Sequence, residues 1–182
     1  MSELAAVLIG GPPATGKSTL AAALAPRLEA ALLDLDVATG PLTRVVSGLA
    51  GTRDLDDPEL ARLTRDARYN TLLDLAGDNL RAGRPVVLVA PFSAERSRPS
   101  AWAATTRRIP APATMVWLHL PAQELIRRLT GRGAARDENK IRDPASYLAG
   151  LDLGPPVIPH LALEATRPAA ELVDAVLRHL SR

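Results

Sequence analysis

Five short runs of apolar residues alternate along the chain with longer stretches whose apolar positions recur at helical spacing. The runs cover residues 4–10, 30–36, 85–90, 114–120 and 160–166. Continuous apolarity, in place of a two-residue alternation, is typical of parallel strands covered on both faces. The strand–helix alternation therefore predicts a doubly wound α/β fold, a parallel sheet with helices on both faces. No repeat or linker divides residues 1–182, so we expect a single domain.

Residues that are typical of helix ends predict where two of the helices begin or end. Asp57 and Pro58 supply an N-cap and a proline at the first position of a helix over residues 58–82, and Gly83 is suited to its end. Near the C-terminus, Thr166 could cap a helix whose apolar stripe runs from Leu172 to Leu180.

Composition narrows the class of protein. Apolar residues make up 47% of 182 residues, enough for a sizeable core, and the net charge of +2 argues against a nucleic-acid-binding protein. There is no cysteine, which excludes a disulfide framework and thiolate metal sites and fits a reducing compartment. The N-terminal segment lacks the basic region of a signal peptide. We expect a cytoplasmic protein that does not contact a membrane.

A glycine-rich loop follows the first apolar run and matches G-x-x-x-x-G-K-[ST] at every fixed position. It consists of Gly11, Pro12, Pro13, Ala14, Thr15, Gly16, Lys17 and Ser18, with Thr19 continuing into a helix-forming segment. Glycines let backbone N–H groups approach phosphate oxygens, and the next helix adds the positive end of its dipole. Lys17 would bridge the β- and γ-phosphates, and the Ser18 hydroxyl would complete a Mg²⁺ shell. The loop predicts nucleotide binding.

Asp34 and Asp36 stand at the end of the second apolar run. Open α/β sheets bind ligands at the carboxyl ends of their strands. At the end of a buried strand, the two-residue period turns both carboxylates the same way, and they face the phosphate loop if the second strand is a near neighbour of the first. The alternative is a solvated pair that caps the next segment. Two carboxylates would repel a neighbouring triphosphate unless Mg²⁺ lies between the carboxylates and the phosphates, or unless one carboxylate accepts a proton in the reaction.

A basic segment follows the fourth apolar run. Residues 127–142 hold six cations and two carboxylates, a net charge of +4. Arg128, Arg132 and Arg136 are four apart, so a helix would place them on one side. Gly131 and Gly133 could form a hinge for closure over a nucleotide. The alternative is a solvated basic helix end paired with its own acids.

The phosphate loop, the segment "LLDLDVATGPL" (32–42) and the segment "ELIRRLTGRGAARDENKIRDPASYL" (124–148) together resemble the small P-loop kinases. That group includes shikimate kinase, gluconate kinase and chloramphenicol phosphotransferase. The resemblance implies a P-loop NTPase fold with a five-stranded sheet of order 2-3-1-4-5 and an arginine-rich lid at about residues 130–145. It implies that Asp34 helps to hold the metal's water shell and that Asp36 is the base.

The resemblance also assigns the remaining nucleotide contacts. Arg128 would stack on adenine, Arg132 and Arg136 would reach the phosphates, and Arg167 and Pro168 would line the adenine pocket. One departure concerns the third run, where Val89 stands near the position at which many relatives carry an acidic Walker B residue. Metal anchoring would then depend more on Ser18 and Asp34.

The expected function is transfer of the γ-phosphoryl group of ATP, with Mg²⁺, to a hydroxyl of a small molecule. The missing Walker B carboxylate disfavours a dedicated ATPase. Two alternatives remain open: a nucleotide-binding regulatory or toxin-like protein, and a small ATPase without an acceptor. The sequence does not indicate the acceptor or the oligomeric state.

Overall fold

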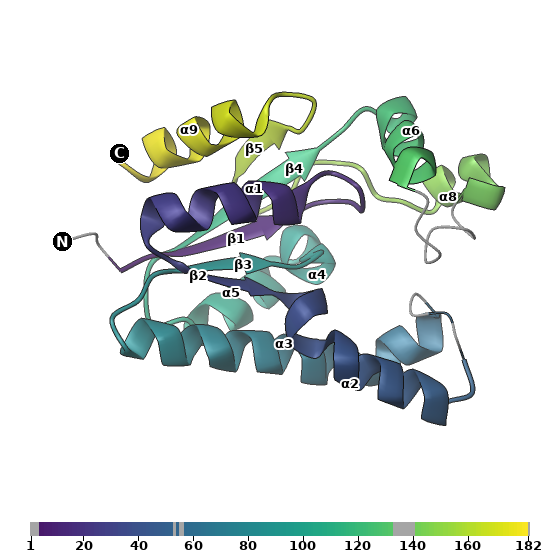
Figure 1. Cartoon of the computed structure of the whole chain (residues 1–182), viewed down its shortest axis with the longest axis horizontal. Coiled ribbons are helices and arrows are strands. Elements are labelled where there is room, and N and C mark those ends of the chain that lie inside the picture. The colour runs from purple at the N-terminus through teal and green to yellow at the C-terminus, as the bar shows by residue number, and fades with distance from the viewer. Residues whose placement is uncertain (1–3, 53, 55–56, 133–140, 182) are drawn as a thin grey trace.

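The computed structural model describes residues 4–52, 54, 57–132 and 141–181. Five strands form one parallel sheet in the order β2-β3-β1-β4-β5 (Figure 1). The strands are β1 Ala6–Gly10, β2 Ala31–Asp34, β3 Val86–Val89, β4 Ala113–His119 and β5 Leu161–Glu164. The predicted α/β fold class and the strand order 2-3-1-4-5 are confirmed.

Helices cover both faces of this sheet. The helices of the described residues are α1 Lys17–Leu24, the 3-10 turn η1 Ala25–Leu28, α2 Leu35–Leu49, α3 Pro58–Arg81, α4 Ser93–Ser97, α5 Pro99–Arg107, α6 Ala122–Arg132, α8 Pro144–Ala149 and α9 Ala169–Leu180. Helices α1 and α9 lie over one face and α3 and α5 over the other, while α6 and α8 lie beyond the carboxyl ends of the strands (Figure 1). In the described part of the chain, no helix is long and apolar enough to cross a bilayer.

Two apolar clusters form the core, one on each face of the sheet. Alternate residues of β1 explain the division: Val7 and Ile9 pack with α1 and α9, whereas Leu8 packs with α3 and α5. Every residue of β1 and β3 is buried, because these strands lie inside the sheet and are covered on both sides. This double burial is the physical reason for the continuous apolar runs.

Strand β2 differs from its prediction. It was expected to be a buried strand through residue 36, but it lies at the edge of the sheet, with Leu32 42% exposed, and it ends at Asp34. Helix α2 starts at the next residue, because Asp34 Oδ1 accepts hydrogen bonds from the backbone N–H groups of Asp36 (2.9 Å) and Val37 (3.4 Å). Asp36 therefore lies in the first helical turn, and the two carboxylates are not related by strand alternation.

The two predicted helix starts had different outcomes. Asp57 caps α3 as expected, with Oδ1 accepting from the N–H groups of Glu59 (3.0 Å) and Leu60 (2.9 Å). Thr166 does not cap α9: its hydroxyl donates to Glu164 Oε1 at 2.8 Å, and Pro168 occupies the N-cap position. The chain thus turns two residues later than the capping pattern indicated.

Candidate active site

The phosphate loop connects β1 to α1 at the carboxyl end of the sheet. Gly11 (φ 146°), Ala14 (φ 59°) and Gly16 (φ 84°) have positive φ angles, which fold the backbone into a tight loop. Thr15 Oγ1 donates to the Pro12 carbonyl at 2.8 Å. Lys17 Nζ donates to the carbonyls of Gly11 (2.9 Å) and Pro12 (2.8 Å), so its ammonium group lies across the loop. This arrangement fits the predicted phosphate-binding role.

The two glycines of the loop provide a matched test of its geometry. A Cβ at Gly11 would lie 2.5 Å from the carbonyl oxygen of Leu118 on β4, whereas apart from chain neighbours no atom lies within 4 Å of a Cβ at Gly16. We expect Gly11→Ala to lower the free energy of unfolding by about 3 kcal/mol or more, since clash and backbone strain add. Gly16→Ala should cost only about 1–2 kcal/mol of backbone strain. Urea unfolding of both variants measures the difference, and equal losses would contradict this account.

Ser18 and Asp34, the two predicted metal residues, are in direct contact. The Ser18 hydroxyl donates to Asp34 Oδ2 at 2.8 Å, while the other carboxylate oxygen caps α2. A hydroxyl and a carboxylate beside a phosphate loop are the oxygen ligands that Mg²⁺ prefers, so this donor set fits the ion. Val89, at the end of β3, pairs in register with Asp34 and lines the same cleft. At the carboxyl ends of these two paired strands, the carboxylate therefore belongs to Asp34 of β2, because β3 has Val89 at the paired position.

Asp36, the predicted base, contacts a residue that the sequence did not suggest. Arg68 Nη2 on α3 donates to Asp36 Oδ1 at 2.6 Å, and Arg68 Nε donates to Thr39 Oγ1 at 2.9 Å. Asp36 remains 61% exposed by side chain. Arg68 thus fixes the Asp36 carboxylate through one of its two oxygens. The spacing of Arg62, Arg65 and Arg68, three residues apart in a predicted helix, was the available signal.

One cleft contains most of the predicted site. Its volume is about 1220 Å³, more than a single drug-sized ligand needs. Its described lining includes loop residues Gly11, Pro13, Ala14, Gly16, Lys17, Ser18 and Thr19, then Asp34 and Asp36, then Arg62, Arg65 and Arg68 of α3, and Arg128 and Arg132 of α6. The phosphate loop therefore forms one wall of the cleft, and α3 forms another.

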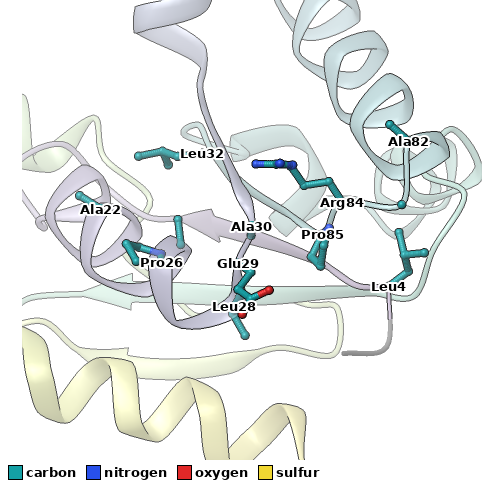
Figure 2. A pocket seen from close by; sticks show the side chains of 12 residues that line it. Leu4, Ala22, Pro26, Leu28, Glu29, Ala30, Leu32, Ala82, Arg84 and Pro85 are labelled. Carbon is teal, nitrogen blue, oxygen red and sulfur yellow. The ribbon is translucent and has the colours of Figure 1, made fainter. Parts of the chain in front are cut away.

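A second cavity lies at the opposite end of the sheet. It has a volume of about 920 Å³ and is lined by residues around the amino ends of β2 and β3, among them Leu4, Pro26, Leu28, Leu32 and Arg84 (Figure 2). Its lining includes none of the predicted site residues. The carboxyl ends of the strands, where the loop lies, remain the candidate site.

The arginines of the basic segment 127–142 lie partly on α6 and partly outside the described residues. Arg128 Nε donates to Glu124 Oε1 and its Nη2 donates to the Ala165 carbonyl, both at 2.8 Å, which joins α6 to the segment between β5 and α9. A hydrogen bond from Arg127, and to a smaller extent one from Arg128, lowers the pKa of Glu124 to about 2. Arg127 and Arg128 thus both pair with Glu124 on their own helix, and Arg128 also lines the cleft. Arg132 lines the cleft, and Arg136 lies outside the described residues.

The other predicted adenine contacts stand apart from the cleft lining. Arg167 Nη2 donates to Glu171 at 3.0 Å on the first turn of α9, and Pro168 precedes that helix. Neither Arg167 nor Pro168 is among the described residues that line the cleft.

The predicted glycine hinge is described only in part. Gly131 lies within α6, and its expected hinge partner Gly133 falls outside the described residues.

A parallel sheet of order 2-3-1-4-5 with a glycine-rich loop between its first strand and helix defines a P-loop NTPase fold. The sequence matches the AAA domain family over residues 7–148. That match spans most of the chain, so this protein belongs to the AAA domain family, within the P-loop kinase type that the sequence resembles.

Solved structures of small-molecule kinases share this fold. The APS kinase of Mycobacterium tuberculosis in complex with AMPPNP and APS is 19% identical with a TM-score of 0.67, and each chain is covered completely. A gluconokinase from Sinorhizobium meliloti is 20% identical with a TM-score of 0.65, covering 100% of this chain and 94% of the other. The shikimate kinase of Aquifex aeolicus is 17% identical with a TM-score of 0.55, covering 97% and 96%. No curated protein matches the sequence significantly.

Proposed function

We propose that this protein transfers the γ-phosphoryl group of ATP to a hydroxyl group of a small molecule. The observation that supports this most directly is the shared cleft: Lys17 of the phosphate loop, Asp36 and the arginines of α3 all line it. A nucleotide bound along the loop would leave the α3 side open to a second molecule. The kinases of similar fold act on gluconate, shikimate and APS by their names, which supports the same class of reaction here.

The loop and its neighbours would bind the triphosphate. Backbone N–H groups of the loop would donate to phosphate oxygens, and Lys17 would exchange its two carbonyl partners for β- and γ-phosphate oxygens. Ser18 and Asp34 would hold Mg²⁺ directly or through its water shell. Bound Mg²⁺ would supply neutralisation of phosphate charge. Arg128, Arg167 and Pro168 would lie on the adenine side.

Asp36 would activate the acceptor. In the step, the acceptor hydroxyl oxygen forms a bond to the γ-phosphorus while the bond from that phosphorus to the β–γ bridging oxygen breaks, and ADP leaves. The hydroxyl proton passes to the Asp36 carboxylate, which Arg68 holds in place. Lys17, Arg132 and Arg136 would stabilise the charge that spreads over the transferred group.

The test is ADP release from MgATP by the purified protein, alone and with each member of a panel of hydroxylated acceptors. Stimulation by an acceptor, with one phosphorylated product formed per ADP, is the expected result. Steady ADP release that no acceptor changes would favour the small ATPase. Nucleotide binding without turnover under every condition would favour the regulatory or toxin-like alternative.

A further inference from the structure

We propose that α2 is a dimer contact: the outer side of this helix packs against the same helix of a second copy of the chain. The contact is an apolar stripe on α2, which we define as Ala38, Leu42, Val45 and Leu49. The stripe is not among the described residues that line the cleft. The proposal therefore does not depend on the proposed function.

Helix α2 packs against its own chain mainly through small polar residues. It lies alongside α3 at the border of the molecule (Figure 1). Its buried residues follow one another at successive turns on a single side: Leu35, Thr39, Thr43 and Ser47. The Thr39 hydroxyl donates to the Leu35 carbonyl at 2.6 Å, and the Thr43 hydroxyl donates to the Thr39 carbonyl at 2.9 Å. Leu35 is the only residue of α2 in either described core cluster, so the inward side of α2 buries little apolar surface.

The larger apolar side chains of the stripe point to solvent instead. Leu42 is 73% exposed, Val45 is 59% exposed and Leu49 is 84% exposed. With Ala38 they follow one another at intervals of four, three and four residues, which is the spacing of the contact positions in a pair of packed helices. Single exposed apolar residues need no explanation, but a contiguous set marks an interaction site. The stripe therefore fits another helix.

Helix α2 also needs stabilisation that its sequence does not provide. Gly40, Pro41 and Gly48 lie inside it. An interior proline removes one backbone hydrogen bond and costs about 3 kcal/mol, and an interior glycine costs about 1 kcal/mol relative to alanine. A helix of this kind depends on the tertiary packing of an apolar face. Because the inward side of α2 is mainly polar, the exposed stripe is the face that can supply such packing.

The charges of α2 favour a second copy as the partner. Asp36 and Arg44 are its only charged residues, and neither belongs to the stripe. A twofold dimer brings the same surface of both copies together, so charges within it would face like charges. A stripe without charge avoids this repulsion and offers nothing to select a charged partner. A membrane surface would favour several Lys or Arg on the polar side of the helix, and Arg44 is the only one.

The oligomeric state of the full chain in solution tests the proposal. Sedimentation velocity from about 1 to 100 μM protein covers the range in which a moderately tight dimer dissociates. We expect a dimer at the upper concentrations and a Tm that rises with protein concentration, because association stabilises the folded state. A wild-type protein that is monomeric throughout would overturn the proposal. A monomer that binds vesicles of phosphatidylglycerol and phosphatidylcholine would also overturn it, because a membrane would then cover the stripe.

Two valine variants locate the contact. Val45 and Val157 are exposed to a similar extent, 59% and 65%, and Val157 lies outside α2, between α8 and β5. We expect Val45→Glu to raise the dimer dissociation constant by about 100-fold or more, because it buries a carboxylate without a partner in the contact. Val157→Glu is the matched control and should dimerise as the wild type does.

A neutral variant keeps the test decisive if Val45→Glu does not fold. Val45→Ser adds no charge and removes apolar surface from both copies, so we expect it to weaken the dimer by about tenfold. Far-UV circular dichroism establishes that each variant is folded. A dimer as strong in the folded Val45 variants as in the wild type, or an equal loss in Val157→Glu, would show that the contact lies elsewhere.

Discussion

Lys17→Met is expected to lower the rate of ADP formation from MgATP by about 10²–10³-fold. Methionine keeps much of the length of the side chain and removes the ammonium group. In the present structure that group donates to the Gly11 and Pro12 carbonyls at 2.9 and 2.8 Å, so it already lies at the mouth of the loop. A positive charge there stabilises a transition state whose charge spreads over the γ-phosphate oxygens. Initial rates at saturating and limiting MgATP measure the loss.

The control for Lys17 is a cation outside the cleft. Among the described residues, Arg27 on η1 pairs with Asp174 alone, at 3.9 Å between exposed side chains, and it is not part of the cleft lining. Arg27→Met should therefore retain the wild-type rate, since an exposed pair of this kind contributes roughly 0–1 kcal/mol to stability. If Lys17→Met and Arg27→Met turned over MgATP equally well, the loop would not be the nucleotide site.

The sheet was predictable from the sequence because its central strands are buried on both faces. The segments that form β1 and β3 are apolar at every position, and no other described element of that length has this pattern. Helix α2 was missed, since Gly40, Pro41 and Gly48 interrupt the helical pattern. Its first turn depends on one capping carboxylate, that of Asp34, which is also the last residue of β2.

The phosphate loop was predictable for a different reason. Its residues are contiguous, and two of its positions with positive φ, Gly11 and Gly16, are glycines that can be recognised directly in the sequence. The α3 side of the cleft is assembled from separate elements: Asp36 comes from α2, Arg65 and Arg68 come from α3, and Glu95, which contacts Arg65, comes from α4. Arg68 is 29 positions from Thr39 and 32 from Asp36, the two residues to which it donates hydrogen bonds, so a local sequence pattern could not pair them. Only the packing of α2 and α4 against α3 brings them together.

Asp36→Asn is expected to lower kcat for phosphoryl transfer by about 10²–10⁴-fold and to leave the KM for MgATP nearly unchanged. Asparagine can still accept the hydrogen bond from Arg68, so the packing of α2 against α3 is kept while the proton acceptor is lost. Asp78→Asn is the matched control, because that carboxylate is on the same helix as Arg68 but is 72% exposed, pairs with Arg81 and is not among the described residues that line the cleft. Its kcat should equal that of the wild type. A kcat for Asp36→Asn within a factor of about three of the wild type would remove Asp36 as the base, because a lost general base costs more than that. Arg68 would then contact Asp36 only to join α2 to α3, and another group would have to take the hydroxyl proton.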